Sequence, residues 1–460
     1  NNKNKLPLFV TATCEFTRFD DPSRTSAGEY VFLNPDGGGI GLLTTTRLVF
    51  SQPNFDLSKQ FNNIAYEKPN GRFPRLGDLN QFTKFNGPTS VNSRCFSLIG
   101  DPAIKLAYPK LKVFATEVPD SMRALEKVTV KGFVANNSDR KLTDFQGIVY
   151  PTVYGKKEVV GTLNNDGRGV FKYNDQNQVI FKGKASVKNG EFEFSFVVPK
   201  DIDIEFGAGK ISFYADNLEI DANGVYEAHQ IGGIGKNIVA DEKGPDIELF
   251  LNDERFVFGG LTNENPILRA NLFDENGINT VGTGLGHDIV AVLDENTANA
   301  MVLNDFYESN LNSYQSGTIN YQLPELAEGR HTLKLKAWDV HNNSGEAELE
   351  FIVAKNQDLE IENLLNYPNP FTTNTSFYFD HNQPGQSLQV RLQVFTVSGK
   401  LVKTIDGFYY SEGFRAGPIG WNGKDEFGDE IGRGVYVYKV SVKTPTGKSI
   451  EKYQRLVILN

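Results

Sequence analysis

From Leu111 to its last residue, the chain consists of short segments in which apolar and polar residues alternate, and this pattern restricts the fold more than any other feature. In residues 191–198, three phenylalanines and a valine fall on one face of an extended strand. Turn sequences such as Asn189-Gly190 and Asn223-Gly224 separate these segments. Short strands at this regular spacing indicate antiparallel β-sandwiches rather than βαβ units.

Two polar segments divide this β-rich region. One is residues 241–245 (Asp-Glu-Lys-Gly-Pro), and the other is residues 355–358 (Lys-Asn-Gln-Asp). Both contain residues that favour turns and linkers over strands. We therefore predict three β-sandwich modules, at residues 111–242, 243–355 and 356–460.

Residues 1–110 follow a different pattern, which indicates an α/β domain. Residues 6–13 and 38–43 are largely apolar, as is typical of buried parallel strands. A buried strand so close to the start of the chain needs neighbours on both sides. We therefore expect the N-terminal part of this domain to lie outside the chain.

Two helices are predicted in the same region. In residues 56–66, apolar side chains recur at i, i+4, i+7 and i+8, which places them on one helical face. Asn54 or Asp56 is the expected N-cap of this helix. A similar pattern in residues 75–85 predicts a second, shorter helix.

The charge of the chain is uneven. Lys and Arg number 47 and Asp and Glu number 57, so the formal net charge is −10. This charge argues against a general surface for binding nucleic acid or anionic membranes. Residues 1–110 carry 13 Lys and Arg against 9 Asp and Glu, a balance of +4 that suits an acidic substrate or an anionic acceptor. No run of apolar residues approaches the length of a transmembrane helix, and none is predicted.

Cys14 follows the first predicted strand, and the carboxyl ends of strands are where open α/β sheets place functional residues. A thiolate there can attack a peptide carbonyl when a histidine is near and backbone N–H groups stabilise the oxyanion. Two alternatives remain open. Cys14 is a buried structural cysteine, or it forms a disulfide with Cys95, which would abolish the nucleophile. Cys95 begins an apolar segment and is predicted to lie in the core.

The other candidate groups lie far along the chain. All five histidines follow residue 228, so a base on the same sheet as Cys14 would have to come from upstream of the chain. His287, beside Asp288, is a candidate ligand or base, although a hydrogen-bonded turn is favoured. The acidic turns 274–277 and 425–429 offer clustered oxygens for Ca²⁺, but neither fits the EF-hand pattern and solvated turns are favoured. No metal and no cofactor is predicted.

Several segments resemble the gingipain-type cysteine peptidases, which have a caspase-like fold, and in particular the sortases of the type IX secretion system. The resemblance includes the segment around Cys14 and the Phe19-Asp20-Asp21-Pro22 motif that follows it, and it continues into the β modules. The matching segments are residues 6–16, 19–22, 38–47, 100–109, 148–154, 181–185 and 277–280. The last module is similar to type IX sorting domains and flagellar-hook-cap-like immunoglobulin modules, through residues 366–371, 394–402 and 421–425.

The resemblance implies a mainly β protein: the C-terminal part of a caspase-like peptidase domain (residues 1–110), followed by three immunoglobulin-like β-sandwich modules, the last like a sorting domain. It implies that Cys14 is the nucleophile and that the general-base histidine lies upstream, so the chain alone is expected to be inactive. The residues expected at the substrate-binding rim are Glu15, Thr44, Thr45, Thr46 and Arg47.

The implied activity is that of a cysteine endopeptidase and transpeptidase at the bacterial surface, peripherally attached to the outer membrane. Such an enzyme removes the sorting domain of secreted cargo and passes the cargo, through a thioester, to water or an anionic lipopolysaccharide. Its last module would dock to an outer-membrane partner. Two alternatives are a secreted gingipain-like peptidase with its own sorting domain, and a non-catalytic surface adhesin or scaffold.

Overall fold

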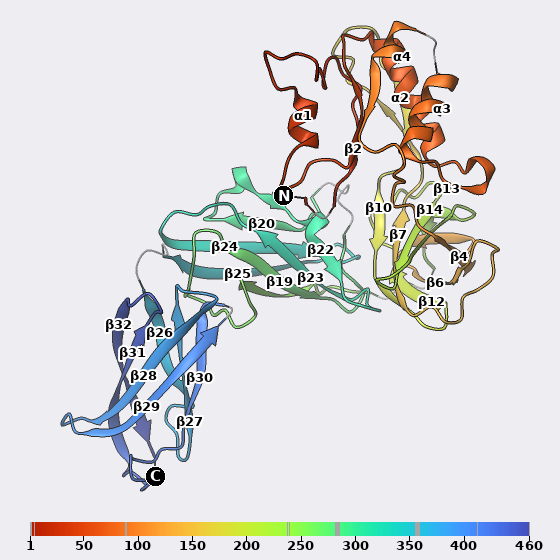
Figure 1. The fold of residues 1–460 in the computed structure, drawn as a ribbon. Coiled ribbons are helices and arrows are strands. Elements are labelled where there is room, and N and C mark those ends of the chain that lie inside the picture. The colour runs from red at the N-terminus through yellow and green to blue at the C-terminus, as the bar shows by residue number, and fades with distance from the viewer. Residues whose placement is uncertain are drawn as a thin grey trace. The chain divides into compact units, whose positions relative to one another are not determined.

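The computed structural model describes the chain except for residues 1, 4, 88–89, 237, 239, 281–285, 355–358, 412 and 460. The predicted linker 355–358 and the residues just before Gly286 therefore lie outside the described residues. The chain divides into two compact units, Asn1–Pro109 and Lys110–Asn460 (Figure 1). The described residues are mainly β, as predicted, and all of their α-helices lie in the first unit.

The first unit is built on a three-stranded sheet in the order β1-β2-β3. Its strands are β1 (Leu8–Val10), β2 (Gly41–Thr45) and β3 (Phe96–Ile99). Strands β1 and β2 are parallel, with Leu8 opposite Gly41, whereas β2 and β3 are antiparallel. The predicted α/β class is confirmed. The segment 6–13 overestimated the extent of β1, whereas the segment 38–43 begins three residues before β2 and ends two residues before β2 ends.

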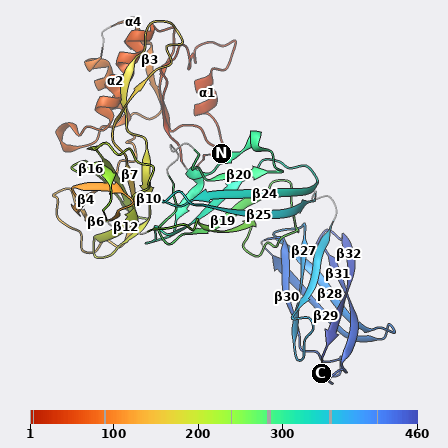
Figure 2. The same ribbon diagram turned by 180° about the vertical axis from the view of Figure 1, so that it is seen from behind.

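Helices cover both faces of this sheet. They are α1 (Ala27–Phe32), α2 (Ser51–Ala65), α3 (Leu76–Asn86) and α4 (Val91–Cys95), with a 3₁₀ turn η1 (Pro69–Gly71). Helix α1 lies on one side of the sheet and α2 and α3 lie on the other (Figures 1 and 2). The predicted apolar face of α2 is confirmed, because Leu57, Phe61, Ile64 and Ala65 are all buried.

The predicted N-cap of α2 is wrong. The helix begins at Ser51 with Phe50 as the cap, and Asn54 lies buried within it. The backbone N–H of Phe50 donates to the Asn92 side chain (3.0 Å), and the Asn92 amide donates to the carbonyl of Phe50 (2.7 Å). A distant residue in α4 thus holds the start of this helix, and no local capping residue is needed.

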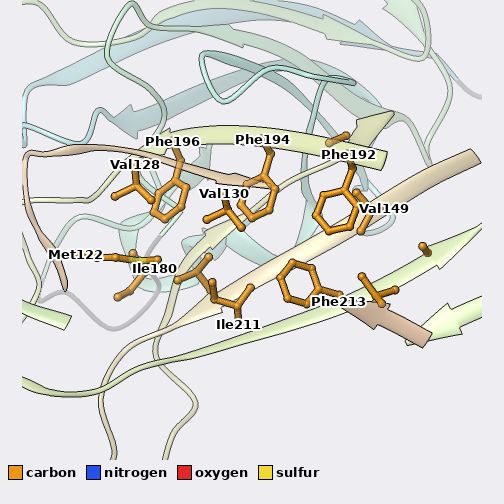
Figure 3. Packing of buried hydrophobic residues seen from close by; sticks show 14 of the residues in the cluster. Met122, Val128, Val130, Val149, Ile180, Phe192, Phe194, Phe196, Ile211 and Phe213 are labelled. Carbon is orange, nitrogen blue, oxygen red and sulfur yellow. The ribbon is translucent and has the colours of Figure 1, made fainter. Parts of the chain in front are cut away.

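The second unit begins with a module that packs an eight-stranded sheet against a three-stranded one and carries a two-stranded sheet, β8-β9. Its strands are β4 (Leu111–Glu117), β5 (Ser121–Ala124), β6 (Lys127–Ala135), β7 (Gly147–Tyr154), β8 (Glu158–Gly161), β9 (Lys172–Asp175), β10 (Val179–Lys182), β11 (Ala185–Val187), β12 (Glu191–Val197), β13 (Gly207–Ala208), β14 (Lys210–Asp216), β15 (Asp221–Tyr226) and β16 (Gln230–Ile234). Phe192, Phe194 and Phe196 point from β12 into the core toward Val130 and Phe213 (Figure 3). The predicted alternation of this strand is confirmed.

The next module has a four-stranded and a five-stranded sheet. Its elements are β17 (Asp246–Leu251), β18 (Gly260–Thr262), β19 (Ile267–Phe273), β20 (Val290–Leu293), η2 (Thr297–Asn299), β21 (Met301–Val302), η3 (Asn304–Phe306), β22 (Tyr307–Ser309), β23 (Ser316–Gln322), β24 (Gly329–Trp338) and β25 (Ser344–Val353). The hydrogen bond from the Lys200 N–H to the Val340 carbonyl (2.9 Å) joins it to the preceding module.

The last module has a three-stranded sheet and a four-stranded sheet. Its strands are β26 (Ile361–Tyr367), β27 (Thr375–His381), β28 (Gln386–Thr396), β29 (Leu401–Ser411), β30 (Arg415–Trp421), β31 (Gly434–Lys443) and β32 (Ser449–Ile458). Each of the three modules has its own buried apolar cluster. No helix in the described part of the chain has the length and apolar character that crossing a membrane requires.

Candidate active site

Cys14 lies at the edge of the sheet where β1 and β2 both end. Because β1 and β2 are parallel, the segments that leave them, residues 11–17 and 46–50, run side by side. The Thr11 N–H continues the pairing by donating to the Leu43 carbonyl (3.0 Å). Cys14 is exposed, and its Sγ lies 3.5 Å from the carbonyl oxygen of Val49. An accessible thiol therefore occupies the position where such sheets carry functional groups.

Both cysteines are free thiols. Cys95 is buried at the end of α4, and its carbonyl accepts bonds from the Thr46 N–H (2.8 Å) and the Thr46 hydroxyl (3.1 Å). Cys95 is thus a core residue, as expected, that fixes the segment leaving β2. Cys14 is exposed and its thiol is free, so the two alternatives for it, a buried structural cysteine and a disulfide with Cys95, are both wrong.

Buried threonines hold the loop that carries Cys14. The Thr44 hydroxyl, which is fully buried, accepts a bond from the Thr11 hydroxyl and lies 2.8 Å from the Thr17 hydroxyl. The Thr45 hydroxyl donates to the Thr13 carbonyl, and the Thr17 N–H donates to the Thr45 carbonyl (3.0 Å). Residues 11–17 are therefore fastened to β2 on both sides of the cysteine.

The residues predicted at the substrate-binding rim differ in whether they can reach a substrate. Thr44 and Thr45 are fully buried and their hydroxyls bond within the protein, so the rim prediction does not fit these two side chains. Thr46 also directs its hydroxyl inward, to the Cys95 carbonyl. Arg47 and Glu15 fit the prediction better, because the Arg47 side chain is exposed and Glu15 adjoins Cys14.

Charged side chains brace the loop beyond Cys14. Glu15 adopts a left-handed backbone conformation (φ 50°), which is uncommon outside glycine. Its carboxylate lies 3.0 Å from Arg18 and 3.6 Å from Arg24, and both arginines also reach Asp21. Hydrogen bonds from Ser23, with help from these arginines, lower the pKa of Asp21 below its usual value. The loop is thus held by alternating charges as well as by hydroxyl bonds.

Arg47 forms a second ionic contact at the same edge. Its guanidinium pairs with Asp20, and its Nη1 also donates to the Thr46 carbonyl (2.7 Å). The hydrogen bonds from Arg47 lower the pKa of Asp20. Sequence reasoning missed this pairing, as it missed the roles of Thr11, Thr17 and Asn92, because each of these contacts joins residues at least 27 positions apart.

The first unit contains no histidine that could act as a base. In the second unit, the His287 Nδ1 lies 2.6 Å from the Asp201 carboxylate, and its ring packs edge-on against Trp338. The His331 Nδ1 lies 2.7 Å from the Asp294 carboxylate, and its Nε2 lies 2.8 Å from a backbone carbonyl.

The acidic turn 425–429 is closed by its own backbone. The Asp425 carboxylate accepts bonds from the N–H groups of Phe427 and Asp429, both at 2.9 Å. This geometry is that of an ordinary Asx turn.

Comparison with known proteins gives one family match. Residues 1–107 match Peptidase family C25. Latent dimeric PorU from Porphyromonas gingivalis is 30% identical over 86% of this chain, with a TM-score of 0.37. The matched region is only 38% of that protein's chain. No curated protein matches the chain.

Two further solved structures match the chain at low identity. SGBP-B of the mixed-linkage glucan utilization locus of Bacteroides ovatus is 12% identical, covers 77% of this chain and 71% of its own, and has a TM-score of 0.22. A tetra-tandem repeat from the extending region of a large adhesion protein is 11% identical, covers 76% and 74%, and has a TM-score of 0.18. Neither likeness carries an argument about function.

Proposed function

Because residues 1–107 match Peptidase family C25, a family of cysteine peptidases, we propose that the chain is the C-terminal portion of a type IX secretion system sortase with Cys14 as its nucleophile. The observation that carries this proposal is the exposed, free thiol of Cys14 at the carboxyl end of a parallel strand pair inside the matched segment. Cys95, the other thiol of the chain, is buried.

In the proposed reaction, the Cys14 thiolate attacks the peptide carbonyl that precedes the sorting domain of a secreted cargo protein. The C–N bond breaks, the sorting domain leaves with a protonated amine, and the cargo remains as a thioester on Cys14. Water or a sugar amine of an anionic lipopolysaccharide then attacks the thioester and releases the thiolate. The histidine that moves these protons is proposed to lie upstream of the chain.

In the proposed reaction, the residues around Cys14 hold its thiol in place and contact the substrate. The threonine bonds fix the loop, so that the thiol is held where a substrate carbonyl can approach it. Glu15 and Arg47 are the proposed polar contacts for the cargo chain or the anionic acceptor. The enzyme would work at the bacterial surface, attached peripherally to the outer membrane, and its last module would dock to an outer-membrane partner protein.

The test uses the full-length protein, including its upstream part, and a cargo protein with an intact sorting domain. Cys14→Ala is expected to abolish cleavage and to prevent a thioester adduct from appearing by mass spectrometry. Cys95→Ala, which removes the buried thiol of the same unit, is the matched control and is expected to retain cleavage. Normal processing of cargo by Cys14→Ala would refute the proposal and favour a scaffold.

A second measurement separates the sortase from a secreted peptidase. A sortase keeps its last module, whereas a cargo peptidase loses it during export. Mass spectrometry of the mature C-terminus is therefore expected to find the module intact. A mature protein that ends before residue 356 would favour the secreted peptidase.

A further inference from the structure

Three loops of the second unit bring metal-binding side chains together. Asp241 lies between β16 and β17, where the first β module passes into the second. Asp339 and His341 follow β24 in the second module. One donor atom from each of these three residues lies within 4.8 Å of the other two. That spacing fits donors around one cation, because protein ligands bind divalent metals at about 2.0–2.6 Å.

These groups are shielded from water. Asp339 is fully buried, and the side chains of Asp241 and His341 are only 13% and 9% exposed. Asp274, in the turn after β19, is 5% exposed and raises the charge further. Among the described residues, no Lys or Arg forms an ion pair with any of these three carboxylates. Three shielded carboxylates with only His341, 4.0 Å from Asp241, as an ion-pair partner among the described residues are costly, so the cluster favours a bound cation.

Asp274 supplies a separate indication of a ligand. One of its oxygens accepts bonds from the backbone N–H groups of Asn276 (2.8 Å) and Gly277 (2.9 Å). Its second oxygen has no hydrogen bond or ion pair with a described residue. Asp274 and Asp241 both line a cavity of about 140 Å³, which is large enough for an ion with bound water.

We propose that Asp241, Asp339 and His341 bind a divalent cation at this junction, and that Asp274, a third carboxylate beside them, contacts the cation through a bound water molecule. The imidazole in the ligand set favours Zn²⁺ or Mn²⁺ over Ca²⁺, which is bound by oxygen ligands. The cation would fasten the connecting segment to two loops of the second module. Hydrogen bonds already align these parts, from the Asn276 amide to the Asp241 carboxylate (2.6 Å) and from the Asn343 amide to the Asp241 carbonyl (3.1 Å).

The test uses the 460-residue chain without an affinity tag, stripped of metal with a chelator and titrated calorimetrically with Zn²⁺, Mn²⁺ or Ca²⁺. We expect saturable binding of one Zn²⁺ or Mn²⁺ per chain and a higher unfolding temperature in its presence. A Co²⁺-loaded sample is expected to show a visible spectrum that changes when His341 is replaced.

The variants are chosen to preserve folding. Asp241→Asn and His341→Gln keep hydrogen-bonding side chains and are each expected to lower the affinity at least about tenfold. His331→Gln removes a histidine that pairs with Asp294 elsewhere in the same module, and it is the matched control that should bind as the parent does. If no metal binds saturably, the proposal fails. It fails equally if both cluster variants bind with unchanged affinity, or if only Ca²⁺ binds and His341→Gln leaves that binding unaltered.

Discussion

Replacing Thr44 with valine tests whether buried hydroxyls hold the Cys14 loop. The valine keeps the shape of the side chain and removes a hydroxyl that contacts those of Thr11 and Thr17, each at 2.8 Å. Thr17 is 1% exposed and would lose a partner that water cannot replace, whereas Thr11 is half-buried and can bind water. A buried hydroxyl without a partner costs about 1–3 kcal/mol. We therefore expect Thr44→Val to destabilise the first unit by about 2 kcal/mol.

The assay must report on the first unit alone. Tryptophan fluorescence cannot do so, because both tryptophans, Trp338 and Trp421, lie in the second unit. The buried thiol of Cys95 can, because it reacts with an alkylating reagent only when the unit opens. In a Cys14→Ser background, a loss of about 2 kcal/mol should raise the labelling rate of Cys95 about 30-fold, provided that reclosing is faster than labelling.

Two controls make the result specific. Thr44→Ser restores the hydroxyl and is expected to label close to the parental rate. Thr25→Val removes an exposed hydroxyl from the same unit and is expected to change stability by no more than about 0.5 kcal/mol. Equal labelling rates for Thr44→Val and the parent would refute the reasoning, and so would a serine variant as fast as the valine variant.

Three further predictions follow from burial and close approach. In the native chain, a thiol reagent should modify Cys14 quickly and Cys95 only after denaturation; two fast thiols would contradict the structure. Gly28→Ala should destabilise the first unit in the Cys95 labelling assay, because its Cβ would lie 1.8 Å from the Thr17 hydroxyl; an unchanged rate would show that the contact relaxes freely. Burial lowers the pKa of His381 to about 4. Between about pH 6.5 and about pH 4, His381 is therefore protonated in the unfolded state but neutral in the folded state. The last module should therefore lose about 3 kcal/mol as the pH falls from about 6.5 to about 4. Trp421 fluorescence in denaturant measures this loss, which should shrink in His381→Asn.

Local patterns predicted the elements well. The alternation of residues 191–198 placed Phe192, Phe194 and Phe196 in the core, where they are buried. Helical spacing likewise identified the buried face of α2. Both predictions succeed because the periodicity of apolar residues is set by which face of an element is buried.

The site was harder to predict, because its contacts are not local. The family resemblance implied a substrate rim at the three threonines, yet Thr44 and Thr45 are buried, with hydroxyls that bond to the Cys14 loop more than 26 residues away. The start of α2 depends on Asn92, 42 residues from Phe50. A sequence shows which groups can form hydrogen bonds, but only the fold decides which partners they meet.

Three of the histidines in the second unit are poorly suited to act as a general base. A base must keep one ring nitrogen free to take the proton of the thiol. Both ring nitrogens of His331 are engaged, by Asp294 and by a backbone carbonyl. His381 is fully buried, and its Nδ1 accepts a bond from the Gln383 N–H (3.2 Å). His229 is 2% exposed, and burial lowers its pKa. Each of these three side chains therefore contributes to the packing or hydrogen bonding of its own module rather than presenting an accessible, unengaged ring nitrogen.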